Sequence, residues 1–150
     1  TCIDPYRIRV TGRTKHFINV FGEELIVENT DKALEIVSKK IGCRIRDYSV
    51  APIFMKGKEK GAHEWLIEFK TPPKDINYFT ELLDNALKAL NSDYEAKRYN
   101  NTTLNIPKVV VARKGLFQDW LKSLNKLGGQ HKVPRLSNSR SLLEALQKRF

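Results

Sequence analysis

The hydrophobic and polar side chains at the start of the chain alternate with the period of a β-strand. Residues 6–11 alternate apolar and polar positions, which predicts a strand with one buried face. The polar segment 12–15 turns the chain, and a second extended run over residues 16–21 ends at Gly22. We expect these two runs to pair as a hairpin.

The pattern then changes to that of a helix. Apolar residues recur at helical spacing from Thr30, a suitable N-cap, to Ile41, and Gly42 stands where a C-terminal cap belongs. Residues 43–54 form the next extended run. Its apolar face changes near residues 47–48, which indicates a bulge or a bend.

A further strand and the longest amphipathic helix follow. Residues 64–69 place three large apolar side chains on one face, and Glu64 and Glu68 on the other. Helical spacing of apolar residues extends over 76–90, and Asp75 suits the first turn of that helix. We expect this helix to pack on a sheet.

The last third predicts one short strand and two helices. The β-branched run 109–111 fits a buried strand, and a wide apolar stripe predicts a helix over 116–127. A terminal helix follows, with Ser137 or Ser139 as its N-cap. Residues 128–140, GGQHKVPRLSNSR, have no apolar periodicity of their own and are interpreted as a functional loop.

The resulting order is β-β-α-β-β-α-β-α-α. Mixed strands and helices with tight hairpins predict an α+β fold, in which about four helices pack on a mixed, largely antiparallel sheet. A length of 150 residues and a hydrophobic content of 41% suit one domain with its own core, residues 1–150.

The excess of positive charge is concentrated near the C-terminus. The net charge is +10, and residues 105–150 hold ten Lys and Arg against two acidic residues. Such a gradient predicts an anionic partner for the last third, whether a nucleic acid, a nucleotide phosphate or an acidic protein face. The alternative is a basic surface without a partner.

Signals for metal binding, secretion and membrane insertion are weak. Cys2 and Cys43 are too few for a disulfide framework or a zinc site, so a reducing cytoplasm is expected. His16, His63 and His131 lie far apart and have no ligand at a suitable spacing, which favours structural or solvated roles. No long apolar run or signal peptide is recognised.

Recognisable catalytic motifs are also absent. The sequence has no glycine-rich phosphate loop and no nucleophile elbow. Glu23 and Glu24 are adjacent carboxylates near a turn, which are usually solvated, and no catalysis is assigned to them.

Several ordered segments are similar to a known family. TGRTKHFINVFGEELIVENTDKAL resembles the start of the small C-terminal domain of adenylate-forming enzymes. NSDYEAKR, PKVVVARKGLFQDWL and GGQHKVPRL are similar to the distal part of the plant auxin-responsive acyl-acid amido synthetases and their bacterial relatives. The similarity extends over nearly the whole chain.

The resemblance implies a mobile C-terminal lid rather than a complete enzyme. Its partner would be its own large N-terminal adenylation domain, which this chain does not contain and which would hold most of the ATP and acid pockets. The start at Thr1 instead of Met favours a domain of a longer protein. The implied reaction is adenylation of a carboxylic acid with ATP and Mg, followed by attack of an amino acid on the acyl adenylate to form an amide.

The resemblance also implies roles for individual residues. Lys132 would be the catalytic lid lysine that reaches phosphate and carboxylate oxygens during adenylation, and an ammonium on a flexible stem suits that task. His131 and Arg135 would assist electrostatically. The alternative is that these residues only solvate a loop.

A second group of residues would face the large domain in the amide-forming step. The resemblance places Arg13, Phe21, Gly22 and Glu23 there. The alternative is a plain turn.

Two other functions remain open. A basic nucleic-acid-binding module would show the same charge and mixed fold, but most aromatic residues fall on stripes expected to be core, so no specific nucleic acid is expected. The third possibility is a protein-interaction domain without chemistry.

Overall fold

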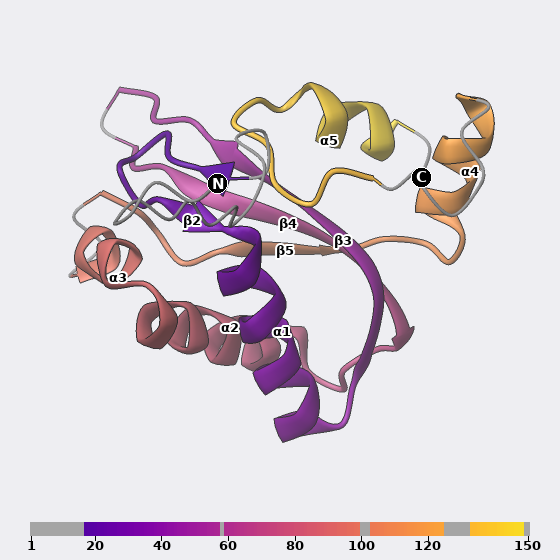
Figure 1. The fold of residues 1–150 in the computed structure, drawn as a ribbon, viewed down its shortest axis with the longest axis horizontal. Coiled ribbons are helices and arrows are strands. Elements are labelled where there is room, and N and C mark those ends of the chain that lie inside the picture. Colours follow the sequence, from indigo (N-terminus) through magenta and orange to yellow (C-terminus); the bar gives the residue numbers. More distant parts are fainter. Residues whose placement is uncertain (1–16, 58, 100–102, 125–132, 149–150) are drawn as a thin grey trace, which may run out of the picture.

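The computed structural model describes residues 17–57, 59–99, 103–124 and 133–148. A three-stranded sheet forms its centre, with β3 (Arg44–Ile53), β4 (Ala62–Thr71) and β5 (Lys108–Val111) in that order (Figure 1). β3 and β4 are antiparallel, whereas β4 and β5 are parallel. The mixed sheet of the predicted α+β fold is confirmed.

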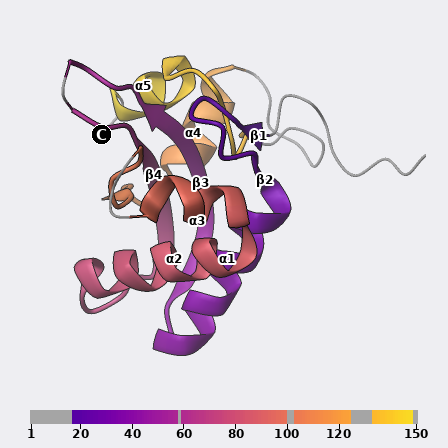
Figure 2. The ribbon, with the colours of Figure 1, turned by 90° about the vertical axis from the view of Figure 1, so that its left-hand side faces the viewer.

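Helices cover both faces of this sheet. α1 (Val27–Ile41), α2 (Ile76–Leu90) and α3 (Ser92–Arg98) lie on one face, and α4 (Leu116–Ser123) and α5 (Ser141–Gln147) lie on the other (Figure 2). Five helices are therefore present in the described residues. No described helix is both long and apolar enough to cross a bilayer.

The central strand β4 is buried on both sides. Trp65, Ile67 and Phe69 belong to the core under α1 and α2, as the alternation predicts. Leu66 belongs to a second core with α4 and α5. Glu64 and Glu68 share the face of Leu66 and are only 3% and 2% exposed, because these helices cover that face.

The first hairpin differs from the prediction. β1 (Phe17–Ile18) is shorter than the extended run expected over 16–21 and pairs with β2 (Leu25–Ile26), which the pattern does not reveal. Two-residue strands are too short to show an alternation. The predicted strand at 6–11 lies outside the described residues.

The capping predictions for two of the helices are confirmed. Gly42 ends α1 with a left-handed φ of 73°, and Asp75 caps α2 by accepting hydrogen bonds from Asn77 N and Tyr78 N. α1 begins at Val27 rather than near Thr30. The bulge expected in β3 also occurs, with register shifts between Arg44 and Asp47.

Three predictions in the C-terminal half need correction. The pattern does not predict α3, since seven residues show little periodicity. β5 is an edge strand rather than a buried one, and Val111 is 48% exposed. α5 is preceded by Arg140 as its N-cap instead of Ser137 or Ser139.

A buried polar network attaches α3 to α2. Tyr94 Oη donates to Asp84 Oδ1 at 2.7 Å, and Arg98 Nε and Nη2 donate to the two oxygens of Asp84 at 2.8 and 2.7 Å. Burial disfavours the charged carboxylate, but these donors outweigh it and lower the pKa of Asp84. The network is structural because its members are paired with one another.

Candidate functional site

The described part of the basic C-terminal segment lies along the edge of β3. Val50 N donates to the carbonyl of Arg135 at 2.7 Å, and Ser137 N donates to Val50 O at 3.1 Å. Ser49 Oγ donates to Pro134 O at 2.9 Å. This part of the segment is therefore attached to the sheet and protects its edge.

Two apolar side chains add to this attachment. Leu136 is fully buried in the core under α1, and Val133 is 3% exposed in the core under α4 and α5. Two residues are too few to create a hydrophobic period, which is why the sequence pattern shows only a loop here.

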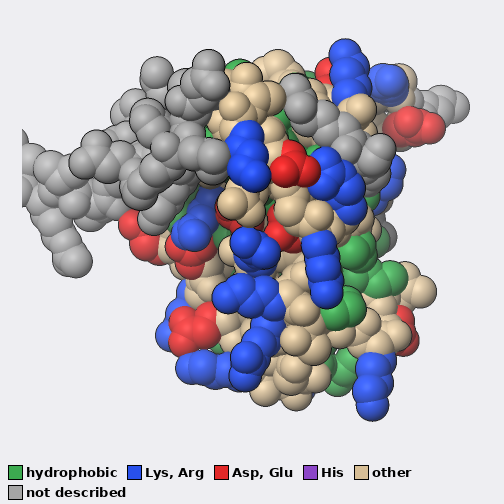
Figure 3. Space-filling view, turned by 90° about the vertical axis from the view of Figure 1, so that its right-hand side faces the viewer, with side chains coloured by type: hydrophobic (Ala, Val, Ile, Leu, Met, Phe, Trp, Pro, Cys, Tyr) green, Lys and Arg blue, Asp and Glu red, His purple; other side chains and the backbone are tan. Residues whose placement is uncertain are grey.

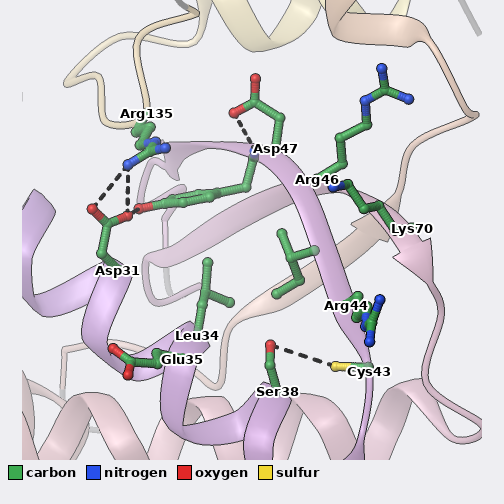
Figure 4. Close-up of a pocket in the computed structure, with 12 residues that line it drawn as sticks. Asp31, Leu34, Glu35, Ser38, Cys43, Arg44, Arg46, Asp47, Lys70 and Arg135 are labelled. Carbon is green, nitrogen blue, oxygen red and sulfur yellow. Dashed lines mark hydrogen bonds and ion pairs between the residues drawn. The ribbon is translucent and has the colours of Figure 1, made fainter.

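Arg135 is held by residues of α1 and β3. Its Nη1 lies 3.0 and 2.9 Å from the carboxylate oxygens of Asp31, and its guanidinium lies 5.4 Å from the ring centroid of Tyr48 (Figure 4). Tyr48 Oη donates to Asp31 Oδ1 at 2.5 Å and lies 2.7 Å from Thr30 Oγ1. The charge of Arg135 thus has a local counter-ion.

The phenol of Tyr48 remains a donor in this arrangement. Burial, followed by the hydrogen bond to Asp31, raises the pKa of Tyr48 well above its usual range. Its proton therefore stays on the phenol oxygen throughout the neutral range. Asp31 consequently accepts hydrogen bonds from Tyr48 and Arg135 together.

Arg140 attaches the other end of the segment. Its Nη2 lies 2.6 Å from Glu64 Oε1, and its Nη1 donates to Pro52 O at 2.9 Å. Lys108 Nζ reaches the second Glu64 oxygen at 3.3 Å. Although burial opposes the charge on Glu64, Arg140 and Lys108 lower the pKa of its carboxyl. Residues 133–140 are thus anchored to the sheet at both ends.

The loop around Gly22 is fixed by a buried pair. His63 Nε2 lies 2.7 Å from Glu23 Oε1, and Glu23 Oε2 accepts from Phe21 N at 2.8 Å. Glu23 is fully buried, so the expectation that this carboxylate is solvated is wrong. The strand position of His63 brings a partner from 40 residues away, and this distance explains why the local pattern misses it.

Phe21 and Gly22 lie at the surface end of this arrangement. Gly22 is exposed with a φ of 82°, a conformation that favours glycine, and Phe21 is half-buried. The Phe21 ring packs directly over Gly61, where an added Cβ would overlap the ring. The position of Phe21 therefore depends on a glycine in the loop before β4.

The structure brings the two segments singled out from the sequence side by side. Asn19 N donates to Asn138 Oδ1 at 3.0 Å, and Asn138 Nδ2 donates to Phe17 O at 2.9 Å. The hairpin that leads to Gly22 and the anchored basic segment are therefore joined through one side chain.

The remaining predicted site residues cannot be placed. Arg13, His131 and Lys132 lie outside the described residues, so their roles stay predictions.

A cationic cleft is present that the sequence pattern does not predict. It has a volume of about 480 Å³, lies between α1 and β3, and includes Arg44, Arg46, Lys70 and Arg135 in its lining. Figure 3 shows Lys and Arg side chains gathered in a column on one face of the molecule. The sequence feature that could have indicated this cleft is the pair Arg44 and Arg46, which lie two residues apart in a predicted strand.

Metal binding finds no support in the part of the chain that the structure describes. There, no group of three or more His, Cys, Asp or Glu side chains is arranged to hold an ion. Cys43 is a free, buried thiol.

Comparison with known proteins points to one family. A model of the GH3 family C-terminal domain matches residues 28–141. No curated protein sequence matches the chain. The fold is similar to that of the AtGH3.15 acyl acid amido synthetase in complex with 2,4-DB, with a TM-score of 0.69 and 16% identity over 91% of this chain and 26% of the other.

A second solved GH3.15 acyl acid amido synthetase gives a TM-score of 0.70 and 17% identity, with 91% of this chain and 27% of the other covered. The chain thus spans about a quarter of the length of these solved synthetases. At this level of identity the likeness shows a shared fold.

Proposed function

This chain belongs to the family of GH3 C-terminal domains, and from that premise we propose that it is the mobile C-terminal domain of an ATP-dependent acyl acid amido synthetase. The observation that carries the proposal is the family match over residues 28–141. The partner would be a large N-terminal domain of the same protein, since this chain covers only 26% and 27% of the solved synthetases.

The proposed reaction has two steps. A carboxylate oxygen of the acid substrate attacks the α-phosphorus of ATP, and pyrophosphate leaves. The amine nitrogen of an amino acid then attacks the acyl carbon, an amide bond forms and AMP leaves.

In this proposal Lys132 is the catalytic residue of the first step. Its ammonium would neutralise charge on the carboxylate and phosphate oxygens as the new P–O bond forms. The chain directly after Lys132 is anchored to β3 through Val133 and Arg135. This attachment holds the backbone that follows Lys132 against the sheet, which supports a defined position for the lysine side chain during the first step.

For Arg135 we propose a different role from the one that the resemblance implies. Because Asp31 pairs with its guanidinium, less of its charge is available to a substrate. We assign Arg135 to positioning the loop, with His131 left as the electrostatic assistant.

The loop at Phe21 and Gly22 would face the large domain in the second step. Its exposed glycine and half-buried phenylalanine suit a contact surface. Glu23 would act indirectly, because its buried carboxylate holds the backbone N–H of Phe21.

ATP and Mg²⁺ would bind mainly to the large domain. The described residues of this chain include no carboxylate cluster that fits Mg²⁺, which prefers several oxygen ligands. We therefore expect no adenylation by the isolated chain. Pyrophosphate exchange measured with candidate acids tests this expectation, and sustained ATP-dependent exchange would contradict it.

The central test uses the full-length parent protein. Lys132→Ala should slow acyl-adenylate formation by about 10²–10³, the cost of one lost electrostatic contact of this type, and leave amide formation from supplied adenylate nearly unchanged. Lys122→Ala, an exposed lysine on α4, is the control. Equal slowing of both steps would indicate that the domain no longer docks on the large N-terminal domain. No slowing of either step would mean that Lys132 only solvates the loop and has no catalytic role.

The nucleic-acid alternative is tested separately. Clustered Lys and Arg should give weak, salt-sensitive binding to any polyanion. Sequence discrimination of about a thousandfold at physiological salt would instead favour a nucleic-acid-binding module.

A further inference from the structure

Three cationic side chains meet at one end of the sheet, in the cleft that Arg135 also lines. Arg44 and Arg46 come from the start of the bulged strand β3, and Lys70 comes from the end of β4. All three line the cleft of about 480 Å³ beside α1. In Figure 4 they form the wall opposite Asp31 and Glu35.

Two of the three acidic side chains of this cleft, Asp31 and Glu35, are paired with cations outside the opposite wall. Asp31 is bound by Arg135 and Tyr48, and Glu35 Oε1 lies 2.8 Å from Lys39 Nζ. Hydrogen bonds and attraction from Lys39 lower the pKa of Glu35, which keeps this carboxylate charged. The third carboxylate, Asp47, lines the cleft beside Arg46, and its Oδ1 accepts from Tyr48 N at 2.8 Å.

Two of the three cations have no such partner. Arg46 Nε lies 3.4 Å from Glu68 Oε2. Among the described residues, the side chains of Arg44 and Lys70 form no hydrogen bond or ion pair. Among the described residues, Arg44 and Lys70 therefore carry positive charge without a paired carboxylate, and the cleft holds more cations than acidic groups.

The backbone brings these charges to the same end of the sheet. Arg44 and Arg46 flank Ile45 in the bulged start of β3, where the register to β4 shifts. Lys70 falls within the register shift of β4, and its side chain lies beside Arg46 in Figure 4. Like charges on neighbouring strand positions repel, and a bound anion relieves that repulsion.

We propose that this cleft binds a small molecule through a diphosphate group. Guanidinium forks match pairs of phosphate oxygens, and the ammonium of Lys70 adds a point charge. The volume falls in the range of small-molecule sites, about 300–1,000 Å³. Leu34 and Ile45 also line the cleft and offer apolar contact to the organic part of such a ligand.

A second hollow extends the same charged surface. It measures about 260 Å³, shares Arg46 and Lys70 with the first cleft and adds Lys114, together with Glu68, the partner of Arg46. A diphosphate spanning both hollows would meet a cation at each end. The residues involved belong to β3, β4 and the loop before α4, so the inference does not depend on amido synthetase activity.

The test is a titration of the isotope-labelled chain with inorganic pyrophosphate at low salt, followed by amide NMR shifts and calorimetry. Saturable shifts are expected at residues 44–47 and 70. The Arg44→Gln/Lys70→Gln variant should bind at least about tenfold more weakly, which corresponds to about 1.4 kcal/mol. Both side chains are exposed, so the variant should keep the fold.

The matched control removes two charges from a neighbouring surface. Lys40→Gln/Lys74→Gln changes two exposed lysines outside the cleft and should alter affinity by no more than about twofold. An equal loss in both double variants would show nonspecific attraction and overturn the proposal, as would shifts without saturation.

Two further ligands identify the source of the diphosphate. ADP binding more tightly than pyrophosphate would assign the cleft to a nucleoside diphosphate, and equal affinity would assign it to the free anion. A hexaglutamate peptide binding more tightly than both would overturn the proposal in favour of an acidic protein surface.

Discussion

Replacing Asp31 by Asn removes the charge that anchors the basic C-terminal segment. In the native structure this carboxylate accepts from Arg135 Nη1 at 3.0 and 2.9 Å and from Tyr48 Oη at 2.5 Å. Asn keeps the shape and one acceptor oxygen. The change therefore isolates the contribution of the charge.

Two contributions set the expected magnitude. The Arg135 and Asp31 side chains are 39% and 44% exposed, so solvent screens their ion pair to about 0–1 kcal/mol. The phenol of Tyr48 is buried, and its bond to a charged acceptor contributes about 1.5–3 kcal/mol, of which a neutral acceptor retains about half. Asp31→Asn should thus lower the free energy of unfolding by about 1–2 kcal/mol.

Urea unfolding of the 150-residue chain measures this change, and the melting temperature should fall by about 2–8 °C. Glu35→Gln is the control, because Glu35 lies one turn further along α1 in an exposed pair with Lys39 and should cost less than Asp31→Asn. Hydrogen exchange at Ser137 N, which bonds to β3, should accelerate only in Asp31→Asn.

A double-mutant cycle with Arg135→Gln completes the experiment. A positive coupling between positions 31 and 135 is expected, since the two side chains are in direct contact. If Asp31→Asn costs no more than Glu35→Gln and leaves exchange at Ser137 unchanged, the anchoring role is refuted.

Three further changes test other parts of the fold. Asp84→Asn should cost about 3–5 kcal/mol in urea unfolding because it leaves the guanidinium of Arg98 buried without its counter-charge. Since the folded pKa of Asp84 is lowered, its contribution is complete above the unfolded value and declines as pH falls below about 4, so acid titration should destabilise the wild type more than this variant. Gly61→Ala should displace the Phe21 ring, which occupies the space that the added methyl group needs, and unchanged ring resonances in NMR spectra would contradict this contact. Gly42→Ala should cost about 1 kcal/mol through its φ of 73° alone, because nothing lies within 4 Å of the new Cβ, and a thermal melt measures it.

Local patterns are sufficient where an element is long and periodic. α2 spans the predicted residues 76–90, because four turns of apolar spacing and the Asp75 cap lie within one continuous segment. The bulge in β3 is visible for the same reason, as a change of face within one strand. The mixed α+β fold follows from the order of such elements.

Short elements and edge positions are decided by tertiary contacts. β2 and α3 contain two and seven residues, too few for a period to stand out. The run at 109–111 has the pattern of a buried strand because β-branched residues suit any strand, but only the sheet order places β5 at an edge.

The sequence by itself determined which segments carry cations, and it located the excess charge in residues 105–150. Only the tertiary structure decided where those charges act. It pairs Arg135 with Asp31, 104 positions away, and Glu23 with His63, 40 positions away. It also gathers Arg44, Arg46 and Lys70 into a cleft, although they lie outside the C-terminal third. Local propensity depends on neighbours within a few residues, whereas the partner of a charge depends on how sheet and helices bring distant segments together.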